Sequence, residues 1–316
     1  MKQKSKTRYL AEYFVFRAIV CLIDAMPARS AARLAEMLAF VVHHFLPKKL
    51  TRYKVARDNL RTAFGSRYGE AETDAIIFRM WVHLFRMVVE MVQLPRKLRL
   101  YNCADVIDFR NRDATVRVMC TGRPVLVLCG HFGNWEMAIS TFGIFGFPLG
   151  VVARDLDNPY LHAWFCRFRQ ATGHRLISKK GGGGEMVEFL ERRGHLGLLA
   201  DQDAGSRGLF VPFFGKDAST FKSIALLALQ YRAYVCVGYA RRLPDDWQNN
   251  RWVRYELGSE ELIDPLEIDS DDPVRTLTER YTQALERAIL RSPEQYFWVH
   301  RRWKSVPKRR GRRKAA

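Results

Sequence analysis

Residues 124–136 read Pro-Val-Leu-Val-Leu-Cys-Gly-His-Phe-Gly-Asn-Trp-Glu, and this stretch decides the fold class. The run from Pro124 to Cys129 is continuously apolar, which is typical of a strand that is buried on both faces of a sheet. From Gly133 onward the residues follow a helical pattern. A buried strand that turns directly into a helix indicates an α/β protein.

The same alternation continues towards the C-terminus. Further strands are expected at 149–153, 175–177, 196–200, 234–240 and 252–257. Helices are expected at 133–145, 158–171, 183–193, 219–231 and 272–291. This order predicts an α/β sandwich with a largely parallel sheet. Because ligands bind outside the carboxyl ends of such strands, we expect the chemistry in the loops after residues 129, 153 and 200.

The first hundred residues lack strand patterns and are expected to be helical. Segments 9–27 and 31–46 are apolar but carry charged residues, which indicates amphipathic helices that pack together or lie in a membrane interface. A single span beginning near Tyr9 stays open as an alternative. The predicted organisation is a helical, membrane-associating region (1–100), an α/β core (101–306) and a basic tail (307–316).

The chain has 316 residues and a formal net charge of +19, of which residues 1–8 and 301–316 supply 13. A basic surface suits an anionic membrane or an acidic protein as readily as nucleic acid. No zinc module, recognition helix or RNP-like strand is found, so nucleic-acid binding explains only the charge. The six cysteines form no CxxC pair, which indicates a reducing compartment and no zinc ribbon.

His131 and Glu136 are the residues in the opening stretch that could carry chemistry. If His131 precedes the helix, the Glu136 carboxylate can fold back onto the imidazole, which makes a general base and its orienting acid. Gly130 and Gly133 remove side chains where a substrate must approach. The alternative is a helix start with a surface histidine and a capping acid. The spacing lacks the His pair of a helical zinc site, and no metal site is expected.

The sequence HFGNWE on a strand-turn-helix resembles the HxxxxD/E motif of glycerolipid-type acyltransferases. It specifically resembles the bacterial lipid A biosynthesis acyltransferase family, which includes lauroyl and myristoyl acyltransferases. The resemblance extends over about residues 9–306, and three further segments support it. These are Arg154–Pro159, Ala200–Gly205 with Val211–Gly215, and Pro293–Trp303.

The resemblance implies a glycerolipid-acyltransferase-like αβ sandwich that moves an acyl chain from a carrier thioester to a hydroxyl of a glycolipid. His131 would take the hydroxyl proton while Glu136 holds the imidazole, and no acyl-enzyme would form. The absence of a GxSxG nucleophile motif agrees with direct attack. Arg169 is the first candidate for the oxyanion donor and Arg154 the second, with lipid-phosphate binding as the alternative role.

The remaining candidate residues are expected to bind substrate or to be structural. Asp201 and Asn134 are expected to bind substrate, although Asp201 could also orient a basic residue or cap its loop. His300 and the other polar residues of the Pro293–Trp303 segment are expected to be structural, with its arginines facing anionic groups.

The expected partners follow from the same resemblance. The co-substrate would be acyl carrier protein or acyl-CoA, with no other cofactor, and the acceptor a lipid A precursor. Mannosylated phosphatidylinositol and lysophospholipid are the alternative acceptors. The expected location is the cytoplasmic face of the bacterial inner membrane, with the protein peripheral or anchored by its N-terminal helix.

Overall fold

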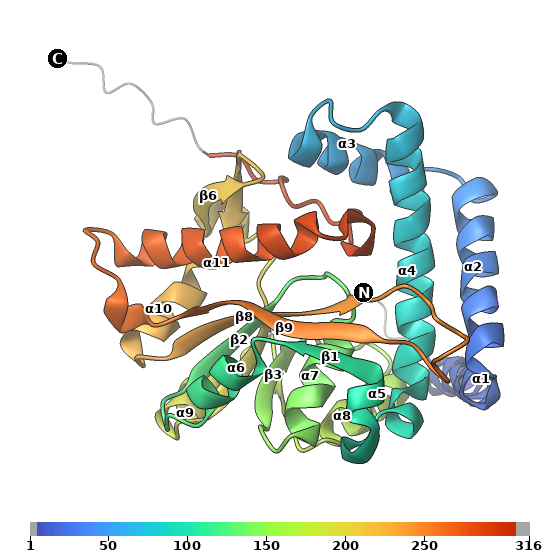
Figure 1. Ribbon diagram of the computed structural model, residues 1–316, viewed down its shortest axis with the longest axis horizontal. Coiled ribbons are helices and arrows are strands. Elements are labelled where there is room, and N and C mark those ends of the chain that lie inside the picture. The colour runs from blue at the N-terminus through green and yellow to red at the C-terminus, as the bar shows by residue number, and fades with distance from the viewer. Residues whose placement is uncertain (1–4, 308–316) are drawn as a thin grey trace.

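The apolar run of the opening stretch forms strand β2 (Val125–Cys129), and all five of its residues are buried. In the computed structural model, which describes residues 5–307, β2 is the central strand of a seven-stranded sheet (Figure 1). The strand order is β1-β9-β8-β2-β5-β3-β4. Every neighbouring pair is parallel except β8 and β9. The predicted α/β fold with a mostly parallel sheet is therefore confirmed.

The elements have the following bounds. The other strands of the sheet are β1 (Ile107–Arg110), β3 (Leu149–Ala153), β4 (Arg175–Ser178), β5 (His195–Leu199), β8 (Tyr234–Arg242) and β9 (Tyr255–Ile263). The helices of this part are α5 (Cys103–Val106), α6 (Arg112–Met119), α7 (Trp135–Ile144), α8 (Pro159–Gln170), α9 (Gly183–Glu191), α10 (Lys222–Gln230) and α11 (Pro273–Leu290). The N-terminal helices are α1 (Lys6–Ala25), α2 (Ala28–His44), α3 (Tyr53–Phe64) and α4 (Glu70–Lys97).

Two parts of the structure were not predicted from the sequence. The segment 201–218, expected to be a loop, instead forms most of the antiparallel pair β6 (Leu209–Phe213) and β7 (Lys216–Thr220). Strand β7 extends two residues into the segment 219–231 that was expected to be helical, and helix α10 begins at Lys222. Phe214 and Gly215 connect these strands with positive φ angles of 51° and 71°, as a tight hairpin turn requires. The second part comprises β1 and α6, which precede β2.

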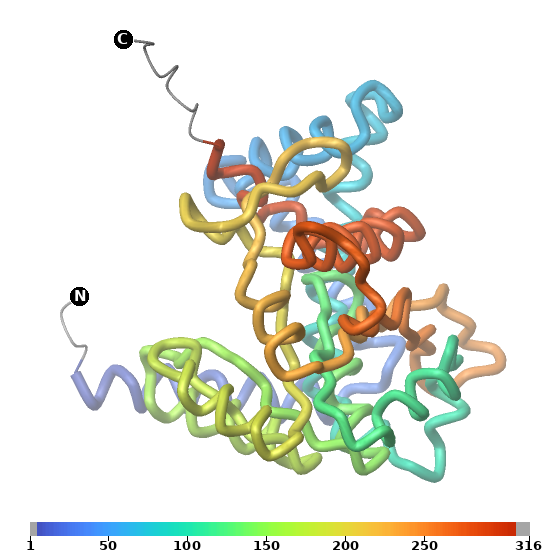
Figure 2. Tube along the Cα trace, turned by 90° about the vertical axis from the view of Figure 1, so that its left-hand side faces the viewer, coloured from blue at the N-terminus to red at the C-terminus, as the bar shows by residue number. Residues whose placement is uncertain are grey.

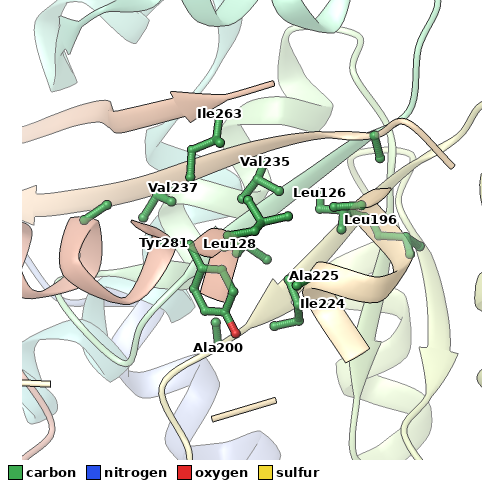
Figure 3. Close-up of a cluster of buried hydrophobic side chains, with 14 of the residues drawn as sticks. Leu126, Leu128, Leu196, Ala200, Ile224, Ala225, Val235, Val237, Ile263 and Tyr281 are labelled. Carbon is green, nitrogen blue, oxygen red and sulfur yellow. The ribbon is translucent and has the colours of Figure 1, made fainter. Parts of the chain in front are cut away.

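Successive side chains of a strand point to opposite faces of the sheet, and both faces of the buried strands are apolar. Helices therefore cover the sheet on both sides. Leu126 and Leu128 of β2 pack in a cluster with α9, α10 and α11, of which Figure 3 shows Ile224, Ala225 and Tyr281. Val125 and Val127 point to the opposite face, where they pack with α6 and α7. The strand is thus covered from both sides, as its continuous apolar sequence predicts.

The N-terminal helices pack against the edge of the α/β part (Figure 1). Ile77 and Met80 of α4 share a buried cluster with Phe132 of the β2–α7 turn and Trp298 near the C-terminus. Helix α1 runs beside α8, as Figure 2 shows, and the Asn158 side chain donates to the Tyr9 carbonyl oxygen at 2.9 Å. No helix within residues 5–307 is long and apolar enough to cross a membrane.

The backbone of the turn between β2 and α7 is held by hydrogen bonds from three distant segments. The Gly133 N–H donates to the Gln295 carbonyl at 3.0 Å, and the Asn134 N–H donates to the Ala240 carbonyl at 2.8 Å. The Gly133 carbonyl accepts from Nε2 of His83 on α4 at 3.1 Å. Gly133 has a φ of +60°, and a Cβ at this position would overlap the carbonyl group of Ala240. Only glycine fits this turn without displacing β8.

We predict that Gly133→Ala lowers the free energy of unfolding by roughly 2–5 kcal/mol, because it combines left-handed backbone strain with a backbone clash. Gly146→Ala is the matched control, since Gly146 also has a positive φ but nothing lies within 4 Å of an added Cβ. That control should cost only about 1–2 kcal/mol. Urea denaturation of both variants measures the difference, and equal losses would contradict the role given to the Ala240 contact.

Candidate active site

The site is centred on His131 and Asp201, which follow neighbouring strands of the sheet. Strands β2 and β5 are parallel and in register, so Cys129 lies opposite Leu199 and both loops leave the same edge. The Asp201 carboxylate accepts from His131 twice: Oδ1 lies 2.7 Å from Nδ1, and Oδ2 lies 2.8 Å from the backbone nitrogen. The loops after residues 129 and 200 therefore meet where the sequence predicted chemistry.

The charges of this pair stabilise each other. Burial alone would raise the pKa of Asp201, but the positive charge and hydrogen bonds of His131 bring that pKa down to about 2. Burial alone would lower the pKa of His131, yet the Asp201 charge and hydrogen bond raise it above its ordinary value. Because an ionised carboxylate only accepts hydrogen bonds, the proton lies on Nδ1 of His131. This tautomer leaves Nε2 as the ring nitrogen that can take a proton.

The prediction that Glu136 holds the imidazole is wrong in this geometry. Glu136 begins α7 and turns towards α8, where its carboxylate accepts from Arg169: Oε1 from Nη2 at 2.5 Å and Oε2 from Nε at 3.1 Å. The sequence distance from His131 to Glu136 is short, but the helix start directs the two side chains to different partners. The Glu136 charge still contributes to the raised pKa of His131.

Arg169 is thus found as the ion-pair partner of Glu136. Its side chain is 24% exposed, and its double hydrogen bond with the nearly buried Glu136 fixes the guanidinium plane. Arg154, the second candidate, follows β3 in an exposed position. Among the two predicted arginines, Arg169 is the one that the structure ties to the motif.

Asn134, predicted to bind substrate, has a structural role instead. It has no accessible surface, and its Oδ1 accepts from the Met137 backbone nitrogen at 3.0 Å, which caps the start of α7. Its Nδ2 donates to the hydroxyl of Tyr255 at 3.1 Å. Both ends of the amide are therefore used within the protein.

A buried polar network continues from Asn134 into α4. The Tyr255 hydroxyl donates to Glu90, and Nε of Arg242 donates to Oε1 of the same carboxylate at 2.8 Å. Arg242 and Glu90 are 8% and 4% exposed, so the network is a buried ion pair that is hydrogen-bonded on several sides. The network connects α4 to β8 and β9, and through Asn134 to the β2–α7 turn.

Two histidines near the site were missed by the sequence reasoning. The His300 ring lies 4.7 Å from the His131 ring between centroids, although the C-terminal segment was expected to be only structural. Burial and the nearby positive charge of His131 lower the pKa of His300 to about 4, so it is neutral beside the pair. Burial likewise lowers the pKa of His83 to about 4, so its neutral Nε2–H donates to the Gly133 carbonyl. No local pattern marks either residue, because each reaches the site from a distant element.

The C-terminal segment also fixes the loop that carries Asp201. Arg302 is 2% exposed and donates to the Ser219 carbonyl and the Thr220 hydroxyl, each at 2.6 Å. Asp203 accepts from the hydroxyl and the backbone nitrogen of Ser305 at 3.0 and 3.2 Å. Arg302 thus hydrogen-bonds to uncharged oxygens, while the negative charges of Asp201 and Asp203 also act on its guanidinium.

Comparison with known proteins gives several relatives. Lipid A biosynthesis lauroyltransferase of Escherichia coli (strain K12) is 28% identical over 195 residues, which are 60% of this chain and 59% of that protein. Lipid A biosynthesis palmitoleoyltransferase of the same strain is 26% identical over 261 residues, or 81% and 80% of the two chains. Phosphatidylinositol mannoside acyltransferase of Mycolicibacterium smegmatis is 29% identical over 48% of this chain and 49% of that one.

A solved structure and a family profile complete the comparison. The 1-acyl-sn-glycerophosphate acyltransferase PlsC of Thermotoga maritima aligns with a TM-score of 0.38 and 13% identity, over 81% of this chain and 98% of that one. The profile of the bacterial lipid A biosynthesis acyltransferases matches residues 1–305. This match extends over nearly the whole sequence, including every segment that builds the site. The chain therefore belongs to the bacterial lipid A biosynthesis acyltransferase family.

Proposed function

We propose that the protein is an O-acyltransferase that moves a fatty acyl chain from a carrier thioester to a hydroxyl of a glycolipid. The observation that carries this proposal is the buried pair of His131 and Asp201 at the carboxyl edge of the sheet. A histidine held by an ionised carboxylate is a general base of the kind that hydroxyl activation needs. Asp201, rather than Glu136, is the orienting acid in this proposal.

The reaction needs no enzyme nucleophile. Nε2 of His131 takes the proton as the acceptor oxygen attacks the thioester carbonyl carbon, and a tetrahedral oxyanion forms. When the intermediate collapses, the C–S bond breaks and the imidazolium returns its proton to the leaving thiolate. Cys129, the nearest cysteine in sequence, does not serve as an alternative nucleophile, since burial raises its pKa to about 12 and keeps the thiol protonated.

In this proposal, Arg169 supplies the positive charge for the reaction. The Glu136 carboxylate holds the guanidinium through Nε and Nη2, which leaves Nη1 to bind the oxyanion or a lipid phosphate. Glu136 acts in this scheme through Arg169, as a positioning residue. This role explains an acid at the fifth position after the histidine without a contact between the two side chains.

The acceptor and donor are proposed from the relatives. Two of them act in lipid A biosynthesis and one is a phosphatidylinositol mannoside acyltransferase, so the common acceptor class is a lipid-linked sugar. We propose a lipid A precursor as the acceptor. Acyl carrier protein, which is acidic, is the proposed donor carrier because it suits a basic protein, with acyl-CoA as the alternative.

An exposed apolar face on the N-terminal helices supports membrane association. On α1, Phe14, Val15, Ile19 and Leu22 are each at least 50% exposed and fall on one side of the helix. Phe45 and Leu50, just after α2, are each 72% exposed. Lys48 and Lys49, between Phe45 and Leu50, are also exposed. Such apolar and basic side chains suit the interface of an anionic bilayer, here the cytoplasmic leaflet of the inner membrane. The basic tail at 308–316 lies outside the described residues.

We predict that His131→Ala and Asp201→Asn lower kcat by roughly 10²–10⁴-fold, because each removes general-base catalysis. Glu136→Gln keeps a hydrogen-bonding side chain next to Arg169 and should lower kcat by a smaller factor. Transfer of a labelled acyl group from acyl carrier protein to a lipid A precursor measures the effects. Circular dichroism confirms that each variant is folded. Full turnover by folded His131→Ala would disprove the mechanism, and an Asp201→Asn enzyme more active than Glu136→Gln would return the orienting role to Glu136.

We predict that replacing Phe14, Leu22 and Phe45 together by serine weakens binding to vesicles that contain phosphatidylglycerol by at least about tenfold. Each large apolar side chain contributes roughly 1.5–3 kcal/mol when it is fully buried in lipid. Leu266→Ser is the control, since Leu266 is 60% exposed but lies between β9 and α11. Co-sedimentation measures binding, and equal binding by the triple variant would exclude this face as the contact surface.

A further inference from the structure

The His300 side chain lies beside His131 but forms no hydrogen bond with the described part of the chain. Its ring centre is 4.7 Å from that of His131, and the two ring planes are inclined by 57°. Neither ring nitrogen of His300 is fully enclosed, and the same is true of Nε2 of His131. By contrast, His83, His174 and His195 each use a ring nitrogen to bind the backbone. The open nitrogens of His300 and His131 therefore face a space that a substrate can enter.

The backbone around His300 is held in a fixed position relative to His131. The Phe297 N–H donates to the His131 carbonyl oxygen at 3.0 Å, so the two segments are joined directly. Nδ2 of Asn59, on α3, donates to the carbonyl oxygens of Trp298 and His300, each at 2.6 Å. Asn59 and Trp298 are both buried. These contacts set the distance between the two imidazoles before any substrate binds.

His300 is neutral although charged groups surround it. Burial is the main cause that lowers its pKa to about 4, and the positive charges of His131 and Arg52 act in the same direction, whereas the Asp201 charge opposes them. A neutral imidazole has one N–H that can donate a hydrogen bond. Because His131 becomes an imidazolium when it takes the acceptor proton, a second positive charge so close would be repelled. His300 thus offers a hydrogen-bond donor without adding a charge.

We propose that His300 is a second catalytic residue, which donates a hydrogen bond to the thioester carbonyl oxygen as that oxygen becomes the oxyanion. This inference rests on the acyl transfer proposed above. A preorganised donor of this kind lowers the barrier because its hydrogen bond strengthens as negative charge develops on the oxygen. A neutral imidazole is able to act as such an electrophile. The donor adds to the positive charge that Arg169 supplies in the proposed mechanism.

The two histidines have different tasks in this step. The acceptor hydroxyl lies about 2.6–3.2 Å from Nε2 of His131, which takes its proton as the oxygen bonds to the carbonyl carbon. The electron pair of the C=O bond moves to the carbonyl oxygen, which accepts from the His300 N–H. When the C–S bond breaks, the C=O bond forms again and His131 returns the proton to the thiolate. His300 keeps its own proton throughout.

The test measures kcat and KM of full-length variants for acyl transfer from acyl carrier protein to a lipid A precursor. His300→Phe keeps a ring against Phe297, whose centre is 4.8 Å away, but has no N–H. It should lower kcat by roughly 10²–10³-fold, as loss of one oxyanion donor does, with KM nearly unchanged. His300→Gln restores an N–H donor and should recover part of kcat. His195→Phe is the matched control, since this half-buried histidine begins β5, at the opposite end from Asp201, and should keep the wild-type kcat.

Three outcomes would overturn the role of His300. A wild-type kcat in folded His300→Phe would show that no donor is needed there, and a raised KM with unchanged kcat would show that the ring only binds substrate. A His300→Phe enzyme more active than His300→Gln would show that the ring acts by packing. If His300→Phe fails to fold, His300→Ala takes its place and should be less active than His300→Gln. In all these cases, turnover that is lost in His131→Ala leaves the proposed acyl transfer standing, whereas a wild type without acyl transfer would overturn both proposals.

Discussion

The site depends on one interaction, the double hydrogen bond between the Asp201 carboxylate and His131. It is possible because β2 and β5 are neighbours in parallel register, so that two loops 70 residues apart in sequence meet at one edge of the sheet. One oxygen of the carboxylate fixes the backbone of the turn and the other fixes the ring. The same group thereby sets the position, the tautomer and the basicity of the imidazole.

Hydrogen bonds from several distant segments hold the two loops that carry this pair. His83 on α4 and Gln295 near the C-terminus both bind the backbone of Gly133, and Ala240 on β8 binds the next residue. Asp203 is tied to Ser305, which restrains the loop that carries Asp201. The helical N-terminal region is consequently part of the site's support, in addition to any contact with a membrane.

The sequence was informative wherever the physical signal is local. The apolar run of β2, the glycines of its turn and the α/β alternation predicted the fold class and the edge at which the site lies. The partner of His131 was not predictable in this way, because Glu136 is near in sequence whereas Asp201 is brought close only by strand register. The same limit applies to His83 and His300, whose roles depend on the packing of α4 and of the C-terminal segment. The β6–β7 hairpin was missed although Phe214 and Gly215 form a recognisable turn.

Glu136 on α7 binds the Arg169 guanidinium, and Asp201 after β5 binds the His131 imidazole. The two carboxylates therefore hold different groups. In the proposed mechanism, the general base and the positive charge for the oxyanion are each held by their own acid. An acyltransferase built this way needs neither a nucleophilic side chain nor a direct contact between the first and last residues of HFGNWE.

An NMR titration of the His131 ring in the wild type, Asp201→Asn and Glu136→Gln tests whether Asp201 holds the imidazole. We expect a proton on Nδ1 of the wild-type ring and a pKa above the ordinary 6.5, because the Asp201 charge favours the imidazolium. In Asp201→Asn that pKa should fall and the tautomer should no longer be fixed, while Glu136→Gln should keep the tautomer. An unchanged titration in Asp201→Asn, or a lost tautomer in Glu136→Gln, would contradict the central claim.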